Sequence, residues 1–124
     1  MSGGSGADLL MLYAGPYAKV VPAPRLVVDA AAGTVTTPDG SGTLRGFETY
    51  RLAGAVPWRF VGSAAAESVW VIDGGGLNAG MGQGDDRITG SPLDDRINGG
   101  AGRDTAYGRG GIDDCRNVEA GDCR

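Results

Sequence analysis

The stretch MGQGDDRITGSPLDDRINGGAGRDTAYGRGGIDDCR, residues 81–116, decides the fold because it repeats every nine residues. In each unit the sixth place is an aspartate, the eighth is a small or apolar residue, and glycines are frequent in the first four. The sixth-place residues are Asp86, Asp95, Asp104 and Asp113, and the eighth-place residues are Ile88, Ile97, Ala106 and Cys115. Such a period predicts a solenoid, in which each unit packs only against its neighbours.

A nine-residue unit divides into about six residues of turn and three of strand, because successive strand side chains point to opposite faces. The sixth-place aspartate then ends the turn and the eighth-place residue points inward. Turns this tight need residues with positive φ, which glycine adopts without strain. We expect that role for Gly82, Gly84, Gly99, Gly100 and Gly102.

Two units make one full turn of the predicted solenoid, so residues eighteen apart stack on the same edge. Asp86 then lies below Asp104 on one edge, and Asp95 lies below Asp113 on the other. Neighbouring strands are about 4.7–4.9 Å apart, and two carboxylates at that spacing repel by about 4 kcal/mol at an effective dielectric near 20. A cation between them would remove this cost. Ca²⁺ suits the pattern because it takes about 6–8 oxygen ligands, including the main-chain carbonyls that glycine-rich loops expose. The alternative is that these aspartates only satisfy backbone groups of their own turns.

The repeat resembles the RTX nonapeptide GGxGxDxUx of the calcium-binding parallel β-roll. GGAGRDTAY, residues 99–107, fits the motif with Ala106 in the apolar place, and MGQGDDRIT fits with Met81 in place of the first glycine. The resemblance implies an all-β fold, a right-handed parallel β-roll with calcium in its edge loops, and export before folding outside the cell. It also implies the ligands, which are the carboxylates of Asp86, Asp104, Asp95 and Asp113 and the main-chain oxygens of Gly82, Gly84, Gly99, Gly100, Gly102, Gly108 and Gly110.

The unit GSPLDDRIN departs from the motif, with Leu93 in a glycine place and Pro92 beside it. A non-glycine residue with positive φ costs about 1–2 kcal/mol, so this loop should bend differently. We therefore expect the Asp95–Asp113 edge to hold calcium less well than the Asp86–Asp104 edge. The fifth-place Asp85 and Asp94 should point to solvent, and Asp114 should form an ion pair with Arg96 one turn below.

Residues 62–116 form the predicted β-roll, and six units from Gly62 make three turns. GSAAAESVW carries Glu67 in the sixth place and Val69 in the eighth, and the next coil, residues 71–80, has one extra residue. Glu67 should share an edge with Asp86 and Asp104. A solvated loop carboxylate is the favoured interpretation of Glu67, and a further metal ligand is the alternative.

Residues 1–61 are predicted to be degenerate coils of the same continuous solenoid. Their opening, GGSGADLLM (residues 3–11), fits one repeat with Asp8 in the ligand place, although a flexible linker is the alternative. If this is a repeat, the chain begins inside a roll. LVVDAAAGTVTT (26–37) predicts two strands around a turn, and TLRGFETYRL (43–52) predicts one half-buried strand.

The end of the chain, residues 117–124, is predicted to cap the roll. Cys115 and Cys123 suit a disulfide across this cap, and two free thiols are the alternative. Of the aromatic residues Trp58, Trp70, Tyr13, Tyr17, Tyr50 and Tyr107, burial is the favoured interpretation and an exposed sugar-binding platform the alternative.

Composition limits the function. The 124-residue chain has 24 glycines, no histidine and a net charge of −4, which argues against nucleic acid and anionic membranes as partners because both favour basic surfaces. No apolar run approaches the roughly 20 residues of a membrane span. Without histidine, Ser-His and Cys-His nucleophile pairs are impossible within the chain, so we do not expect an enzyme.

The sequence therefore predicts a calcium-binding module of a secreted bacterial protein, which folds on meeting extracellular calcium and supports secretion or stability. One alternative is a module that binds polysaccharide or a cell-surface partner. Another is the C-terminal appendage of a secreted lipase or protease within a larger parent polypeptide.

Overall fold

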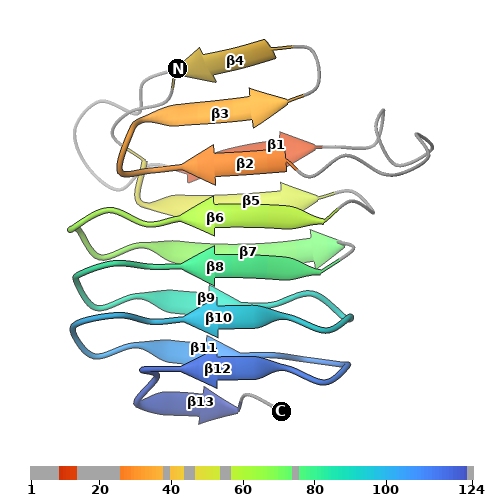
Figure 1. Ribbon diagram of the computed structural model, residues 1–124, viewed down its shortest axis with the longest axis vertical. Helices are drawn as coiled ribbons and strands as arrows, with labels where there is room; N and C mark the ends of the chain where they lie inside the picture. The colour runs from red at the N-terminus through yellow and green to blue at the C-terminus, as the bar shows by residue number, and fades with distance from the viewer. Residues whose placement is uncertain are drawn as a thin grey trace.

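The computed structural model describes residues 9–13, 26–37, 40–43, 47–53, 57–73 and 76–122. Over these residues the chain is an all-β, parallel solenoid of about four turns, as predicted (Figure 1). From residue 40 onward, successive strands alternate between two sheets that run side by side along the long axis. Within the described residues, the structure has no helix long and apolar enough to cross a membrane.

The first sheet has six strands, in the order β1-β5-β7-β9-β11-β13. Every neighbouring pair in it is parallel. Its strands are β1 (Leu9–Tyr13), β5 (Thr49–Ala53), β7 (Ser68–Asp73), β9 (Arg87–Thr89), β11 (Thr105–Tyr107) and β13 (Ala120–Asp122).

The second sheet has seven strands, in the order β12-β10-β8-β6-β2-β3-β4. It is parallel from β12 to β2, and β3 and β4 add antiparallel strands at its N-terminal end (Figure 1). Its strands are β2 (Leu26–Asp29), β3 (Thr34–Thr37), β4 (Gly40–Thr43), β6 (Trp58–Val61), β8 (Leu77–Gly80), β10 (Arg96–Asn98) and β12 (Asp114–Arg116).

The core lies between the two sheets and is built from the inward place of each strand. In the first sheet Val69, Ile88 and Ala106 are register partners and are buried. In the second sheet Phe60, Ala79, Ile97 and Cys115 form the matching row, in which Cys115 is partly buried. The nine-residue period therefore placed the inward side chains correctly.

The core changes in size along the solenoid. Its N-terminal half contains Tyr50, Trp58 and Phe60, and the Tyr50 and Phe60 rings meet edge to face with centroids 4.9 Å apart. Toward the C-terminus the inward residues shrink to Ala106 and Cys115. Because full burial of a large apolar side chain contributes about 1.5–3 kcal/mol, the C-terminal turns gain less from the core and depend more on their loops.

The irregular N-terminal half contains one correct and one incorrect strand prediction. β2 and β3 form the predicted hairpin, whose turn ends at Gly33 with φ of 73°. The single strand predicted over residues 43–52 is wrong. Thr43 ends β4 in the second sheet, Phe47 and Glu48 are not in a strand, and Thr49 starts β5 in the first sheet. The chain changes sheets inside this segment, which an alternating polar pattern does not reveal.

The aromatic residues divide between core and surface. Tyr50 and Trp58 are buried, as predicted, but Trp70 is 45% exposed and Tyr107 is 43% exposed, so burial was wrong for these two. Both follow an inward residue directly, and strand alternation therefore turns them outward. The side chains of Tyr13 and Tyr17 lie outside the described residues, as do Asp8 and residues 3–8 of the predicted opening repeat.

Candidate metal site at the loop edges

One edge of the solenoid carries a column of acidic residues, each placed directly before a strand of the first sheet. The Oδ1 atom of Asp104 accepts a hydrogen bond from the Asp86 backbone nitrogen at 2.9 Å. The Oδ1 atom of Asp86 accepts in the same way from the Glu67 backbone nitrogen at 2.8 Å. The predicted stacking of these three residues is confirmed, and each aspartate ties its own loop to the loop one turn below.

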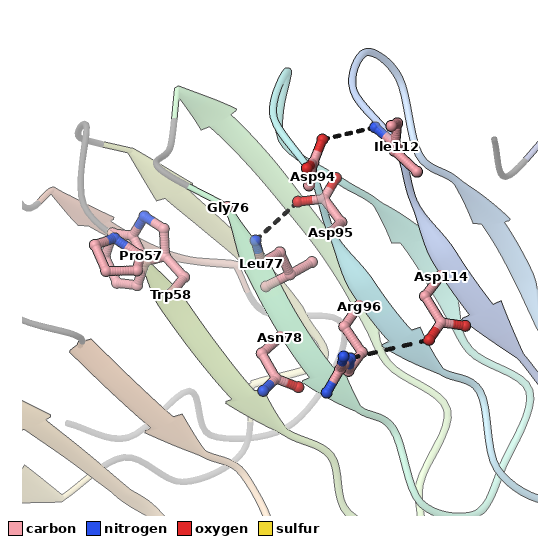
Figure 2. A pocket seen from close by; sticks show the side chains of 10 residues that line it. All are labelled: Pro57, Trp58, Gly76, Leu77, Asn78, Asp94, Asp95, Arg96, Ile112 and Asp114. Carbon is pink, nitrogen blue, oxygen red and sulfur yellow. Dashed lines mark hydrogen bonds and ion pairs between the residues drawn. The ribbon is translucent and has the colours of Figure 1, made fainter.

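The opposite edge repeats the arrangement before strands of the second sheet. Asp113 Oδ1 accepts from the Asp95 nitrogen at 2.8 Å, and Asp95 Oδ1 accepts from the Leu77 nitrogen at 2.8 Å. Figure 2 shows the Asp95 carboxylate turned toward Leu77, beside a pocket of about 440 Å³ that Trp58 and Arg96 also line. Leu77 occupies the acidic place in the ten-residue coil, so the acidic column on this edge begins at Asp95.

The second carboxylate oxygen of each repeat aspartate has no partner. The Oδ2 atoms of Asp86, Asp95, Asp104 and Asp113 are all buried without a hydrogen bond in the described structure. A buried, unpaired charged oxygen is costly unless a cation or donor meets it. One oxygen of each carboxylate is therefore satisfied by the backbone of the neighbouring turn, not of its own turn as the alternative interpretation expected. The other oxygen has no hydrogen-bond partner in the described residues.

The first-place glycines make room for these free oxygens. A Cβ on Gly90 would collide with Asp95 Oδ2, and a Cβ on Gly108 would collide with Asp113 Oδ2. At Gly99 the Cβ would meet Asp104 Oδ2 at 2.7 Å and would also collide with the Asn117 carbonyl oxygen. Gly99 was expected to have positive φ and does not. Glycine is needed at this position because it has no side chain, so the Asp104 carboxylate oxygen and the Asn117 carbonyl oxygen can both lie close to its α-carbon.

Positive φ occurs at the second and fourth places of the loops. Gly82, Gly84, Gly100 and Gly102 adopt it as predicted. In the last repeat the conformation falls on Arg109 and Gly111, rather than on Gly110. Leu93 does not adopt it, so the loop of the second repeat bends differently, as expected.

Two loops replace the glycine pattern with a serine. Ser91 Oγ donates to Asp95 Oδ1 at 2.6 Å and accepts from the Leu93 nitrogen at 3.1 Å. Ser63 Oγ donates to Glu67 Oε2 at 2.7 Å in the same way, and the Ser63 nitrogen donates to Oε1 at 2.9 Å. In both loops the sequence Gly-Ser is followed by an acidic residue four positions after the serine. This pattern was missed when only the sequence was considered.

The favoured interpretation of Glu67 as a solvated carboxylate is wrong. Glu67 is only 5% exposed, and both of its oxygens accept hydrogen bonds from Ser63. Burial raises its pKa despite these bonds. Ser63 thus satisfies both carboxylate oxygens of Glu67 within the loop. Glu67 therefore needs a cation less than Asp86 or Asp104 does.

Burial also raises the pKa values of the repeat aspartates. Desolvation raises the pKa of Asp86 to about 7, and the charges of Glu67 and Asp104 add to the rise. Desolvation raises the pKa of Asp95 to about 6 against the bond from Ser91, which lowers it. Asp104 shifts in the same direction, again chiefly through desolvation. Burial therefore favours the protonated form of these carboxylates where no cation offsets their charge.

An arginine provides a positive charge on the Asp95–Asp113 edge. Arg109 Nη1 donates to the Val71 carbonyl oxygen at 2.9 Å and lies 3.4 Å from that of Gly90. Val71 and Gly90 are the first residues of two successive coils on this edge. The guanidinium therefore occupies two main-chain oxygens on this edge, and the weaker calcium binding expected there stays a prediction.

The fifth-place aspartates are exposed, as predicted, and link successive turns. Asp85 Oδ1 accepts from the Arg103 nitrogen at 2.9 Å, and Asp94 Oδ1 accepts from the Ile112 nitrogen at 2.6 Å (Figure 2). The predicted ion pair of Asp114 is present as well. Its Oδ2 lies 4.0 Å from Arg96 Nε; the Arg96 side chain is exposed and that of Asp114 is partly exposed.

The C-terminal segment contains an acidic residue of the same column that the nine-residue period missed. Residues 120–122 form β13, and Glu119 directly precedes it, in the place that an aspartate takes before β9 and β11. Glu119 Oε2 accepts from the Asp104 nitrogen at 2.7 Å across a separation of 15 residues, not 18. The final loop is three residues shorter, which moved this acid out of the expected phase.

The donor set fits Ca²⁺. Each repeat aspartate offers a buried, unpaired oxygen, and beside Asp95 and Asp104 a main-chain carbonyl of the next turn also approaches the loop glycine. Ca²⁺ prefers such all-oxygen surroundings. In the part of the chain that the structure describes, no three acidic, histidine or cysteine side chains meet at one point. Any metal there would therefore rely on carbonyl oxygens and water, with carboxylates as its charged partners.

The predicted Cys115–Cys123 disulfide stays a prediction, because Cys123 lies outside the described residues. Cys115 itself is partly buried against the core in the inward place of β12.

Comparison with protein families gives one match. Residues 82–115 match the RTX calcium-binding nonapeptide repeat in four copies. The matched family consists of structural calcium-binding repeats and is not a catalytic family. Comparisons with curated proteins and with solved structures gave no match.

Proposed function

We propose that this chain, whose residues 82–115 are four RTX calcium-binding nonapeptide repeats, is a calcium-dependent folding module of a secreted protein. The observation that supports the proposal best is the set of free Oδ2 atoms on Asp86, Asp95, Asp104 and Asp113. They are repeated and buried, and glycines make room for those of Asp95, Asp104 and Asp113.

The protein prepares each site through its backbone. The Oδ1–nitrogen bond fixes the carboxylate against the turn below, as for Asp104 and Asp86. The first-place glycine holds a carbonyl oxygen of the turn above close to the free oxygen, as Gly99 does with Asn117. Ca²⁺, when bound, supplies the positive charge that offsets the buried carboxylates. Folding then depends on the metal, because the unfolded chain has no preformed site.

A small core makes this dependence effective. The inward residues of the repeats are limited to Ile88, Ile97, Ala106 and Cys115, and a glycine-rich acidic segment without metal buries little apolar surface. Flexible extracellular modules bind calcium with dissociation constants of about 10⁻⁴–10⁻³ M. We therefore place folding outside the cell, where calcium reaches such concentrations.

A calcium titration followed by circular dichroism tests the proposal. The full chain should have little β signal in chelator and should gain it cooperatively on adding calcium. Asp86→Asn should move the midpoint to at least about tenfold higher calcium, a change of about 1.4 kcal/mol. Asp85→Asn is the matched control, since it removes the same charge from the exposed neighbour in the same loop.

Two results would count against the proposal. One is full β structure in chelator that calcium leaves unchanged. The other is an equal shift for Asp85→Asn and Asp86→Asn, which would mean that calcium responds to overall charge and not to the buried oxygens.

One observation favours a second candidate function, the binding of an extracellular polysaccharide. Trp70 and Tyr107 are exposed on the outer face of the first sheet, in one row with Thr89 between them. The Arg51 guanidinium lies over the Trp70 ring, 5.3 Å from its centroid. Exposed, rigid aromatic rings suit stacking on sugar faces, although Tyr50 and Trp58 are buried and cannot contribute.

A glycan array with wild-type protein and the Trp70→Ala and Tyr107→Ala variants separates the two functions. Glycan binding that both substitutions abolish, with the calcium midpoint unchanged, would support the polysaccharide role. Binding that survives both substitutions would remove this face from consideration.

A further inference from the structure

We propose that the outer face of the second sheet binds a sulfate group in a hollow over Gly80. The hollow has a volume of about 400 Å³ and lies across β6, β8, β10 and the end of β12. Its charged and polar lining residues are Arg59, Asn78, Arg96, Asn98 and Arg116. The site faces outward from the sheet and uses none of the proposed calcium ligands.

The first argument is the register of the outward residues. Arg59 pairs with Asn78, and Asn78 pairs with Arg96 (Figure 2). Neighbouring strands are about 4.7–4.9 Å apart, so the two arginines stand on either side of β8. Gly80 follows Asn78 by two residues on β8 and faces the same side. The strand between the two guanidiniums therefore offers one short polar side chain and one position without a side chain.

The second argument is the open space over Gly80. A Cβ added there would meet nothing within 4 Å, and Gly80 does not have positive φ. Strand β8 also pairs with both neighbours without a shift in register, so no bulge accounts for the glycine. A glycine inside a strand weakens it and often marks the close approach of a ligand. The missing side chain leaves room for an anion against the main chain of the sheet.

The third argument is the charge around the hollow. No acidic side chain lines it in the part of the chain that the structure describes. Asp114, outward on β12, lies 4.0 Å from Arg96 Nε and 3.4 Å from Arg116 Nε, so one carboxylate serves both guanidiniums. Within the described residues, the Arg59 side chain forms no hydrogen bond or ion pair. Asp29, further along this face, accepts a hydrogen bond within its own turn and does not line the hollow. The hollow therefore keeps an excess of positive charge, although the chain has a net charge of −4.

The donors around the hollow suit an oxyanion. Asn98 Oδ1 already accepts from the Gly100 nitrogen at 3.1 Å and from Asn117 Nδ2 at 2.9 Å, which leaves the Asn98 amide nitrogen as a donor. Guanidinium groups bind oxyanions through paired N–H groups. A sulfate group carries acceptor oxygens on every side, so it can accept from several of these donors at once.

A sulfate titration of the full-length, folded protein in saturating calcium, followed by NMR of the backbone amides, tests the site. Sulfate is the probe because phosphate precipitates with calcium. Arg59→Gln removes a guanidinium that has no partner in the described residues, and it should weaken binding by at least about tenfold. Gly80→Val keeps every charge but fills the hollow, and it should weaken binding as well. Arg87→Gln is the matched control, because Arg87 is an exposed strand arginine of the first sheet.

The outcomes separate a built site from general attraction to positive charge. The amide signals of residues around Gly80 should shift with sulfate and not with chloride at equal ionic strength. No sulfate-dependent shift in wild type, or equal weakening by Arg87→Gln and Arg59→Gln, would overturn the site. If a variant does not fold, wild-type crystals grown with selenate replace it. An anomalous peak between Arg59 and Arg96 would support the site, and selenate bound only elsewhere would exclude it. A chain that proves to be folded in chelator contradicts the proposed function, and the same titration then runs without calcium.

A second titration identifies the source of the sulfate group. A sulfated oligosaccharide that binds more tightly than inorganic sulfate, while its desulfated form does not bind, would assign the site to a sulfate ester on a glycan. Tighter binding of inorganic sulfate would assign it to the free ion. Both results support the site, and binding of the desulfated oligosaccharide to the same residues with equal affinity would overturn the role of the sulfate group.

Discussion

Asp104 Oδ1 lies 2.9 Å from the Asp86 backbone nitrogen, while Asp104 Oδ2 is buried with no partner. One carboxylate thus performs two tasks. The first oxygen links successive turns through the backbone, and the second remains available to a cation. The Oδ1 bond reaches the backbone of the turn below, whereas the alternative interpretation expected a bond within the aspartate's own turn. The proposed role as a metal ligand concerns Oδ2.

The two edges of the solenoid should differ in calcium affinity. On the first edge, Asp104→Asn should raise the calcium midpoint by about tenfold, or about 1.4 kcal/mol, because the loop of Asp104 has no serine that donates to its carboxylate. Asp95→Asn should raise it by less than about threefold. Asp95 already accepts from Ser91, and Arg109 binds carbonyl oxygens on its edge. The measurement is a calcium titration of both variants by circular dichroism.

Comparing the calcium midpoints of Asp104→Asn and Asp95→Asn tests whether the two edges differ in affinity. The prediction fails if Asp95→Asn shifts the midpoint as much as Asp104→Asn. Asp94→Asn, at the exposed fifth place of the Asp95 loop, serves as the control for loss of charge on that edge.

Arg109 should stabilise the calcium-bound solenoid. Arg109→Met keeps much of the side-chain volume but removes the donor to Val71 and Gly90. Hydrogen bonds from charged groups contribute about 1.5–3 kcal/mol, so the free energy of unfolding in saturating calcium should fall by about that amount. Denaturant unfolding measures it.

The control for Arg109 is Arg103→Met, at an exposed position in the loop of the preceding repeat. It should change the free energy of unfolding by less than about 0.5 kcal/mol, as is usual for surface substitutions. Similar losses for the two variants would contradict the role assigned to the Arg109 guanidinium.

The repeat itself predicted most of the fold. A period of nine with strand alternation placed Ile88 and Ile97 in the core and Asp86 and Asp104 on one edge. The same alternation implies that Trp70 and Tyr107, next to inward residues, face solvent. The prediction that the aromatic residues are buried did not take this alternation into account, and it was wrong for these two residues.

The remaining features depend on geometry that a period does not contain. Glu119 was missed because the final loop lacks three residues, although its backbone place is that of Asp104. Arg109 was missed because its partner Val71 is 38 residues away in sequence. The hydrogen bonds from Ser63 and Ser91 to acids four residues later have a local signature, and comparing those two loops would have revealed it.

The calcium-free and calcium-bound chains should respond to pH in opposite directions. Burial raises the pKa of Asp86 to about 7 and that of Asp95 to about 6 without metal, above the ordinary value of about 3.9 for an unfolded chain. Protonation therefore favours the calcium-free fold. That stabilisation is fully present below about pH 4 and is lost as the pH rises through 6 to 7.

Circular dichroism in chelator should accordingly show more β structure at pH 5 than at pH 8, while calcium affinity should rise over the same range because the ligands must be ionised. Asp86→Asn removes one of the titrating groups and should flatten the chelator profile. A β signal in chelator that grows from pH 5 to pH 8 would contradict the raised pKa values.

Replacing a first-place glycine by alanine should destabilise the protein, because the added Cβ would take the space of a free carboxylate oxygen. A Cβ at Gly90 would collide with Asp95 Oδ2, whereas a Cβ at Gly80 would meet nothing within 4 Å. Gly90→Ala should lower the free energy of unfolding by at least about 1–3 kcal/mol, the usual cost of overpacking. Gly80→Ala should be neutral or stabilising by up to about 1 kcal/mol, through the lower entropy of the unfolded chain. Denaturant unfolding in saturating calcium compares the pair, and a Gly90→Ala variant as stable as Gly80→Ala would show that the space over Gly90 is not needed for the Asp95 carboxylate.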